Sequence, residues 1–342
     1  MKILIVRFSA FGDIAMTVPV VDALARQYPD VEFTFMSRPF TEPLFSGMPS
    51  NVIFRGVNLD NYEGLFGLGR LSHELLSEGY DMIADLHDVL RTKVIRTWFG
   101  MSGKKVAKIN KGRAEKNKLT QRENKVKYRL PSSFDRYADV FRRLGYPIDD
   151  IRFRSIYGDG RKGDTRLFDK IFGFPGDGKK WIGIAPFAAH RGKILPRHTM
   201  QEVVNTLAAR DNTRIFLFGD RHEKEMLDAW ALPHPNVMTV SGKLKLNGEL
   251  SLMSHLDVMV SMDSANMHLA SLVDTPVVSI WGATHPYAGF MGWRQHQDNA
   301  VQLDLPCRPC SIYGNKHCHR EDYACLENIT AEMVIEKIDN AI

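Results

Sequence analysis

The chain has 342 residues, of which 44% are hydrophobic, and a formal net charge of +5. This length suggests two domains of about 150 residues each, with enough apolar residues for two cores. No apolar run approaches the ~20 residues that a membrane-spanning helix needs, and the first residues lack the small-residue cleavage site of a signal peptide. We therefore expect a cytoplasmic protein.

The first half alternates strand-like and helix-like segments. Strands are predicted at residues 2–7, 31–36, 52–55, 81–85 and 105–109, and helices at 14–28, 68–78, 89–99 and 134–144. This alternation favours a parallel sheet with helices on both faces. We predict that the first domain spans residues 1–158.

The second half repeats this pattern after a stretch rich in glycine and charge, residues 159–180, which we predict to be a linker with one short helix at 167–172. Strands are predicted at 181–185, 214–218, 237–240, 258–261 and 276–280, and helices at 199–210, 223–231, 247–254 and 267–273. The second domain is expected at 181–329, with a final helix over 330–342 that packs back on the first domain. The predicted fold is α/β, with two doubly wound domains facing across a cleft.

The first strand ends in a polar turn that contains Asp13. Gly12 is expected to supply a backbone conformation that other residues resist. Asp13 would then lie close to helix N–H groups, which favour an ionised carboxylate able to take a proton from a substrate hydroxyl. A simple helix cap explains Asp13 equally well. The turn has neither the glycine fingerprint of dinucleotide sites nor a P-loop, so an NAD oxidoreductase is disfavoured.

Four strand ends of the second half carry groups that suit a nucleotide. Lys193 follows the strand at 181–185 and could neutralise a phosphate, and Glu223 follows the strand at 214–218 and could hold ribose hydroxyls. Asp263 and Ser264 precede the helix at 267–273, and a turn that begins at Trp281 follows the strand at 276–280. Because parallel strands end at one sheet edge, we expect a nucleotide pocket there, with the base near Trp281.

Basic residues are concentrated in the middle of the first half. Residues 91–129 include fourteen Lys or Arg but only two acids, Glu115 and Glu123. The middle of this region, residues 103–124, has few large apolar residues, so we expect a long, mobile, basic loop there, which could attract a polyanionic substrate or an anionic membrane surface. The loop's basic residues are not interleaved with aromatic ones, so stacking on nucleic acid bases is disfavoured.

The four cysteines lie in one window with the spacing C-x2-C-x7-C-x6-C. They could hold a structural zinc ion, remain reduced thiols, or form labile disulfides. The candidate zinc ligands are Cys307, Cys310, Cys318 and Cys325.

These motifs together resemble glycosyltransferase family 9, the ADP-heptose:lipopolysaccharide heptosyltransferases, over essentially the whole chain. The matching segments are Ser9-x-x-Gly12-Asp13, the loop at 186–193, Gly219-x-x-x-Glu223, the segment at 263–270 and the segment at 281–286. The resemblance implies the GT-B arrangement of two Rossmann-like domains. It also implies an inverting, metal-independent transfer of a heptose from ADP-heptose to an inner-core lipopolysaccharide acceptor that carries Kdo or heptose on lipid A.

The resemblance also assigns roles to residues. Asp13 would be the catalytic base, and Lys193 would stabilise the departing diphosphate. The donor would be bound by Glu223, Asp263, Ser264, Ala265, His268, Trp281, Gly282 and Thr284. The acceptor would be bound by Ser9, Gly12, Asp85, His87, Arg91, Lys111 and Arg113. We expect a monomer without a cofactor, peripheral to the inner membrane leaflet, that binds a nucleotide-sugar donor and an anionic glycolipid but no nucleic acid.

Two alternatives remain at the level of the sequence. The same fold could use another nucleotide sugar for a different surface glycan. The chain could also be a non-catalytic protein that binds a nucleotide or another anion through its basic loop.

Overall fold

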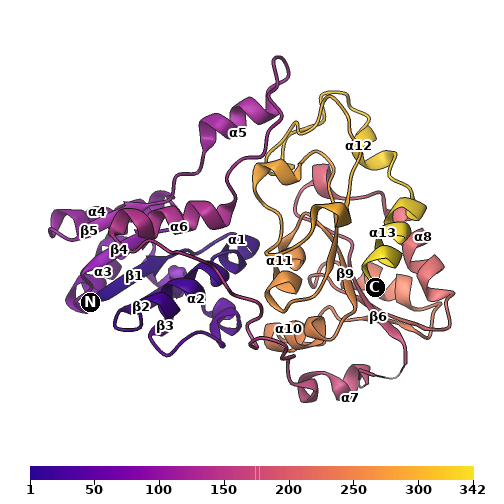
Figure 1. The fold of residues 1–342 in the computed structure, drawn as a ribbon, viewed down its shortest axis with the longest axis horizontal. Coiled ribbons are helices and arrows are strands. Elements are labelled where there is room, and N and C mark those ends of the chain that lie inside the picture. The colour runs from indigo at the N-terminus through magenta and orange to yellow at the C-terminus, as the bar shows by residue number, and fades with distance from the viewer. Residues whose placement is uncertain (174, 177) are drawn as a thin grey trace. The chain divides into compact units, whose positions relative to one another are not determined.

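The computed structural model describes residues 1–173, 175–176 and 178–342. These residues form two compact units (Figure 1). Unit 1 contains Met1–Lys111 and Ser132–Ile156, and unit 2 contains Gly112–Pro131 and Tyr157–Ile342. Each unit is built on one parallel sheet, so the α/β prediction is confirmed.

Unit 1 has a five-stranded sheet in the order β3-β2-β1-β4-β5, and every neighbouring pair is parallel. The strands are β1 Lys2–Val6, β2 Glu32–Ser37, β3 Val52–Gly56, β4 Met82–Asp85 and β5 Lys105–Lys108. The helices are α1 Phe11–Ala15, α2 Val18–Gln27, α3 Gly64–Ser77, α4 Leu90–Met101 and α6 Ser133–Leu144, with 3-10 turns at Pro39–Phe45 and Leu59–Tyr62. The interior of β1 is fully buried, as its apolar sequence predicts.

The single helix predicted at 14–28 is wrong, because α1 and α2 are separate helices. Thr17 lies between them, and its hydroxyl donates to the Ile14 carbonyl at 2.7 Å. Pro19 is in the first turn of α2, where its missing N–H has no helical partner to lose. Within a continuous helix the same proline would have removed a hydrogen bond. The break makes α1 a single short turn that carries Asp13.

Unit 2 has a six-stranded parallel sheet in the order β11-β10-β9-β6-β7-β8. The strands are β6 Lys180–Ala185, β7 Thr213–Leu217, β8 Val237–Thr239, β9 Val258–Met262, β10 Val277–Ile280 and β11 Ala300–Val301. The helices are α5 Arg113–Thr120, α7 Asp169–Phe172, α8 Arg197–Ala208, α9 Lys224–Ala231, α10 Leu246–Ser254, α11 Ala265–Leu272, α12 Ala324–Glu327 and α13 Ala331–Ala341. Short 3-10 turns occur at Thr165–Leu167, Arg191–Lys193, Pro286–Ala288 and Gln297–Asn299.

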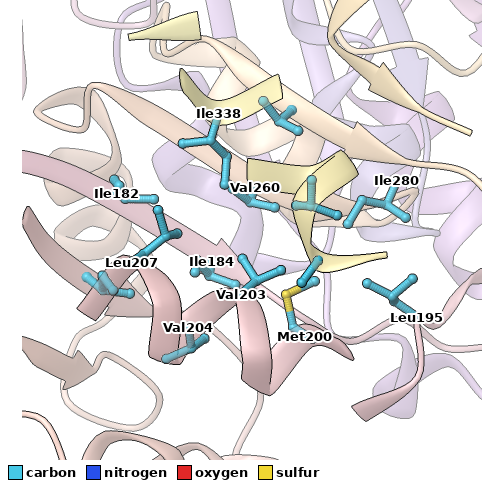
Figure 2. Packing of buried hydrophobic residues seen from close by; sticks show 14 of the residues in the cluster. Ile182, Ile184, Leu195, Met200, Val203, Val204, Leu207, Val260, Ile280 and Ile338 are labelled. Atoms are coloured by element: carbon cyan, nitrogen blue, oxygen red, sulfur yellow. The ribbon is translucent and has the colours of Figure 1, made fainter. Parts of the chain in front are cut away.

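The last helix, α13, belongs to unit 2, so the prediction that it packs back on the first domain is wrong. Figure 2 shows Ile338 of α13 in one apolar cluster with Val203 of α8 and Val260 of β9. All three side chains are fully buried. The apolar face of α13 therefore completes the core between the sheet and α8.

Residues 112–131, which we call the strap, also belong to unit 2. The sequence predicted a mobile basic loop here, but the strap contains α5 and packs as ordered structure. Leu119 and Leu130 of the strap form a small apolar cluster with Ala288 and Ile312. The backbone N–H of Leu130 donates to the Tyr287 carbonyl at 2.9 Å. These two buried leucines and the backbone hydrogen bond help to hold the strap on unit 2.

The predicted domain boundaries are therefore too simple. The strap interrupts the predicted first domain, and the predicted linker at 159–180 falls in unit 2, where it contains a 3-10 turn, α7 and the start of β6. Residues 174 and 177 of that linker lie outside the described residues.

Candidate active site

Each sheet reverses its strand order at one position, and the candidate site residues follow the strands at these positions. In unit 1 the reversal lies between β1 and β4, and in unit 2 it lies between β6 and β9. Open α/β sheets bind ligands outside the carboxyl ends of strands at such switch points. Asp13 follows β1, His87 follows β4, Lys193 follows β6 and Asp263 follows β9.

Asp13 is held at the exit of β1 by two contacts. Its Oδ2 accepts the Ala10 backbone N–H at 3.3 Å and forms an ion pair with Arg7 at 2.8 Å. The Asp13 side chain is 30% exposed, whereas that of Arg7 is only 7% exposed. Gly12 lies inside α1 and is not among the residues with positive φ, so the predicted unusual backbone at Gly12 is wrong. The carboxylate is therefore fixed by a buried cation and a helix turn, and remains open to solvent.

Arg7 was not predicted as a site residue. Its guanidinium donates to the Leu86 carbonyl and lies 5.4 Å from the centre of the Tyr137 ring. The Tyr137 hydroxyl in turn donates to the Asp13 carbonyl at 3.3 Å. A charge placed directly after a buried apolar strand was the available signal, because such a charge needs a partner.

His87 is buried beside this ion pair and is uncharged near neutral pH. Burial, together with the positive charges of Arg7 and Lys111, lowers the pKa of His87 to about 4. The Phe8 backbone N–H approaches His87 Nδ1 at 3.5 Å, which assigns the ring proton to Nε2. That nitrogen lies 3.1 Å from the hydroxyl of Ser9, an exposed residue. Ser9, Asp13 and His87 thus lie together at the ends of β1 and β4, through His87 and Arg7.

The other predicted acceptor residues of unit 1 differ in their availability. Asp85 is fully buried, accepts the His87 backbone N–H at 2.9 Å and pairs with Arg96 at 2.7 Å. It therefore fixes the loop after β4 and offers no exposed surface to an acceptor. Arg91 is exposed in the first turn of α4, and the Lys111 amine donates to the Asp88 carbonyl at 3.1 Å.

Arg113, the last of the predicted acceptor residues, begins α5 and is exposed. It belongs to the strap and therefore to unit 2.

Lys193 and Asp263 form an ion pair in unit 2 at the switch point between β6 and β9. Lys193 Nζ lies 2.9 Å from Asp263 Oδ2, and the two side chains are 16% and 4% exposed. The contact lacks hydrogen-bond geometry, so Oδ2 has no hydrogen-bond partner among the described residues. The sequence predicted both residues as donor contacts but missed their pairing.

Three glycines allow the Lys193 loop to pack closely against its neighbours. A Cβ on Gly192 or Gly282 would lie 2.7 Å from a backbone carbonyl oxygen, and one on Gly314 would lie 2.6 Å from Lys193 Cγ. The Ala283 N–H also donates to the Gly192 carbonyl at 2.8 Å. A glycine at position 282 is therefore required for the packing of this turn.

The start of α11 lies directly after Asp263. Ser264 is the N-cap residue, but its side chain makes no capping hydrogen bond and instead lies 3.2 Å from the Ser261 hydroxyl. The first-turn N–H groups of any α-helix, here starting at Ala265, have no intrahelical partner. Such N–H groups can bind an anion, so the predicted role of this helix start stays a prediction. His268 is buried one turn further along α11.

Glu223 follows β7, next to β6 in the sheet. Its Oε2 accepts the Asp220 backbone N–H at 2.8 Å, which orients the carboxyl group. Burial raises the pKa of Glu223. An oriented, half-buried carboxyl group at this edge can accept hydrogen bonds from a diol.

The prediction that Trp281 contacts a nucleotide base is wrong. Its side chain is fully buried, and its ring N–H donates to the Ser279 hydroxyl at 2.9 Å. Thr284 is also buried, with 1% exposure. The turn that contains both residues is held from inside by Arg308, which donates to the carbonyls of Trp281 at 3.0 Å and of Thr284 at 2.9 Å. Arg308 was not predicted, because nothing in its local pattern distinguishes it from a surface arginine.

Of the three states that the sequence left open for the cysteines, the structure has the free thiols. All four cysteines are free thiols, and burial raises the pKa of Cys325 to about 12. Among the described residues, no three His, Cys, Asp or Glu side chains converge as metal ligands. Within the same part of the chain, no helix combines the length and the apolar character that crossing a bilayer requires.

The two parallel α/β units, each Rossmann-like, have the architecture of the GT-B fold. The family model for glycosyltransferase family 9 (heptosyltransferase) matches residues 68–320. The chain therefore belongs to glycosyltransferase family 9, as its motifs predicted.

Curated relatives match almost end to end. The chain is 27% identical to lipooligosaccharide heptosyltransferase 2 of Haemophilus influenzae, covering 100% of this chain and 99% of the relative. It is 24% identical to lipopolysaccharide heptosyltransferase 1 of Pseudomonas aeruginosa, covering 91% of this chain and 86% of the relative.

Solved structures share the fold. The Veillonella parvula family 9 glycosyltransferase matches with a TM-score of 0.75 at 17% identity, over 99% of this chain and 96% of that chain. The Escherichia coli ADP-heptose lipopolysaccharide heptosyltransferase II matches with a TM-score of 0.70 at 18% identity, over 100% and 98%.

Proposed function

We propose that this protein transfers a heptose from ADP-heptose to an inner-core lipopolysaccharide acceptor, with inversion at the anomeric carbon. The observation that carries the proposal is the pair of switch points, one with an exposed carboxylate and the other with a lysine beside a helix start. The names of the curated relatives support heptose as the sugar and lipopolysaccharide as the acceptor.

In the proposed reaction Asp13 is the general base. Its carboxylate, oriented by Arg7, takes the proton of the acceptor hydroxyl as that oxygen attacks the anomeric carbon. Ser9, which contacts the neutral imidazole of His87, would hydrogen-bond the acceptor sugar. The bond to the ADP oxygen breaks on the opposite face, so the configuration inverts.

Lys193 and the first turn of α11 stabilise the charge that develops on the leaving diphosphate. Preorganised donors of this kind contribute about 3–4 kcal/mol each where their removal has been measured. Glu223 binds the ribose hydroxyls. Because these cationic and N–H groups come from the chain itself, we propose that transfer proceeds without a bound metal ion. EDTA should therefore leave the rate of transfer unchanged.

The proposed acceptor indicates where in the cell the enzyme acts. Inner-core lipopolysaccharide precursors are anionic glycolipids in the cytoplasmic leaflet of the inner membrane. We therefore propose that the protein acts as a monomer at that surface, and that its basic residues attract the acceptor.

Product analysis tests the reaction. The native enzyme is incubated with ADP-heptose and Kdo-bearing lipid A, and mass spectrometry should show an acceptor one heptose heavier. Asp13→Asn should lower kcat by about 10²- to 10⁴-fold and leave ADP affinity within twofold, because a base acts on the acceptor. Near-normal turnover of Asp13→Asn would rule out this base.

Nucleotide binding tests the donor. Thermal stabilisation by ADP should exceed that by UDP or GDP at equal concentration. Stronger stabilisation by UDP or GDP, with no heptosylated product, would instead identify a family member that uses another sugar nucleotide.

A further inference from the structure

Unit 1 exposes large apolar side chains on two adjacent helices. Phe66 is 96% exposed and Leu65 is 70% exposed at the start of α3, and Met101, Leu90 and Trp98 of α4 are 81%, 71% and 42% exposed. We call these five residues the α3–α4 patch. Single exposed apolar residues are ordinary, but a group of five that includes two aromatic residues indicates a surface that contacts a partner.

The patch is one continuous feature of the two helices. The helices pack side by side, and the Trp98 ring lies close to Gly69, which is one helical turn after Leu65 and Phe66. On α4, positions 90, 94, 98 and 101 follow helical spacing and share a face. The opposite faces are buried in the core of unit 1 through Leu71, Leu75, Ile95 and Phe99. The side chains of the patch therefore do not contribute to the core of unit 1.

Positive charge accompanies the patch. Residues 91–111 contain seven Lys or Arg and no Asp or Glu. Arg96 pairs with Asp85, but the side chains of Lys93 and Lys104 have no ion-pair or hydrogen-bond partner among the described residues. Apolar residues bordered by unneutralised cations complement an anionic lipid surface, where rings insert at the headgroups and amines contact phosphates.

We propose that the α3–α4 patch docks unit 1 on an anionic lipid bilayer. This inference deepens the proposed function, because α4 begins three residues after His87 and so ties the patch to the sheet edge that carries Asp13. A bilayer-anchored acceptor would then present its sugar to the same edge of unit 1. We therefore assign the α3–α4 patch to an anionic membrane surface, and the alternative partner is a second copy of the chain.

Vesicle sedimentation tests the surface. The native chain should bind vesicles containing 30% phosphatidylglycerol more tightly than pure phosphatidylcholine vesicles, and salt should weaken the binding. Phe66→Ser and Met101→Ser should each reduce affinity at least tenfold, and Lys93→Gln by about fivefold. The matched control is Leu232→Ser in unit 2, an 87% exposed leucine whose loss should have no effect. Equal binding by all four variants would overturn the proposal.

Trp98 reports directly on docking. It is the most exposed of the chain's five tryptophans, since Trp293 is only partly exposed and Trp181, Trp230 and Trp281 are no more than 6% exposed. Vesicles with brominated acyl chains should quench and blue-shift its emission, and Trp98→Phe should abolish both changes. Unchanged emission on bound vesicles would place the contact elsewhere. A dimer by light scattering that Phe66→Ser converts to a monomer would assign the patch to self-association and overturn the proposal.

Activity assays separate this proposal from the proposed function. Phe66→Ser should retain native turnover on a deacylated, water-soluble acceptor and lose at least tenfold on the same acceptor embedded in vesicles. An equal loss on both acceptors would refute docking. If the native chain transfers no heptose to either acceptor, the proposed function fails while vesicle binding still tests the patch.

Discussion

Replacing Lys193 by methionine should harm both the stability and the nucleotide affinity of unit 2, for two separable reasons. Asp263 is only 4% exposed, and Lys193 is its ion-pair partner. Removing one partner of a buried pair leaves an uncompensated charge, which typically costs about 3–5 kcal/mol. For a domain of this size the melting temperature should fall by about 6–20 °C.

The effect on ADP has a different origin. A charged hydrogen bond to phosphate contributes about 1.5–3 kcal/mol, so Lys193→Met should weaken ADP binding about 10- to 150-fold. The double variant Lys193→Met/Asp263→Asn removes the stranded charge. It should therefore recover most of the lost stability while its ADP affinity stays low. Urea unfolding and calorimetric titration with ADP measure the two effects.

A matched control uses another lysine of the same sheet. Lys180 pairs with Asp257 at 3.4 Å, but their side chains are 46% and 34% exposed. Lys180→Met should change the free energy of unfolding by less than about 1 kcal/mol and leave ADP affinity unchanged. If the double variant is no more stable than Lys193→Met, or if it binds ADP normally, the assignment of Lys193 is refuted.

Three further predictions concern buried polar groups. Arg7→Met should lower kcat about 100-fold with unchanged ADP affinity, because Asp13 loses the cation that orients it, and kinetics that match the native enzyme would exclude this role. Because the pKa of His87 is lowered to about 4, this residue binds a proton in the unfolded chain below about pH 6.5 but stays neutral in the folded chain until about pH 4. Unit 1 should thus lose about 2 kcal/mol of stability between pH 7.5 and 5, and His87→Asn should remove that dependence in urea unfolding. Arg308→Met should destabilise unit 2 by about 3 kcal/mol or more, because several buried carbonyls lose their donor, and a change below 1 kcal/mol would contradict this.

The sequence could predict the two sheets because each central strand is a short, continuous apolar run. Such runs are typical of parallel sheets in α/β proteins, which are buried on both faces. It could also place Asp13 and Lys193 at strand ends, since a parallel sheet brings such ends to one edge. The pairings Arg7–Asp13 and Lys193–Asp263 join residues of opposite charge in the folded units. A charge directly after a buried strand, such as that of Arg7, indicates that a partner is needed, but local spacing does not identify which residue supplies it.

The error at Trp281 has a specific physical cause. An aromatic residue after a strand can stack on a base or fill the core, and both outcomes have the same sequence pattern. Which one occurs depends on Ser279, two residues earlier, whose hydroxyl accepts the indole N–H. The buried Arg308 then satisfies the carbonyls of the turn. This buried polar network joins Trp281 to Arg308, 27 positions later, and contacts at that separation produce no periodic pattern in the sequence.

The basic region shows why a count of charges does not locate a binding surface. In the strap, Lys116 is buried 4.5 Å from the Phe290 ring centre, and Lys125 donates to the Pro309 carbonyl at 2.8 Å. Lys127 pairs with Asp304 at 3.1 Å. These three amines are therefore occupied within unit 2. Among the seven basic residues at 91–111, four are likewise engaged within unit 1, namely Arg96, Lys105, Lys108 and Lys111. Lys93 and Lys104, by contrast, have no ion-pair or hydrogen-bond partner for their amines among the described residues, and Lys93 belongs to the same helix as Leu90, Trp98 and Met101. If the charge that attracts an anionic membrane resides there, neutralising Lys93 and Lys104 should abolish the salt dependence of vesicle binding. Neutralising Lys125 and Lys127 should instead loosen the strap.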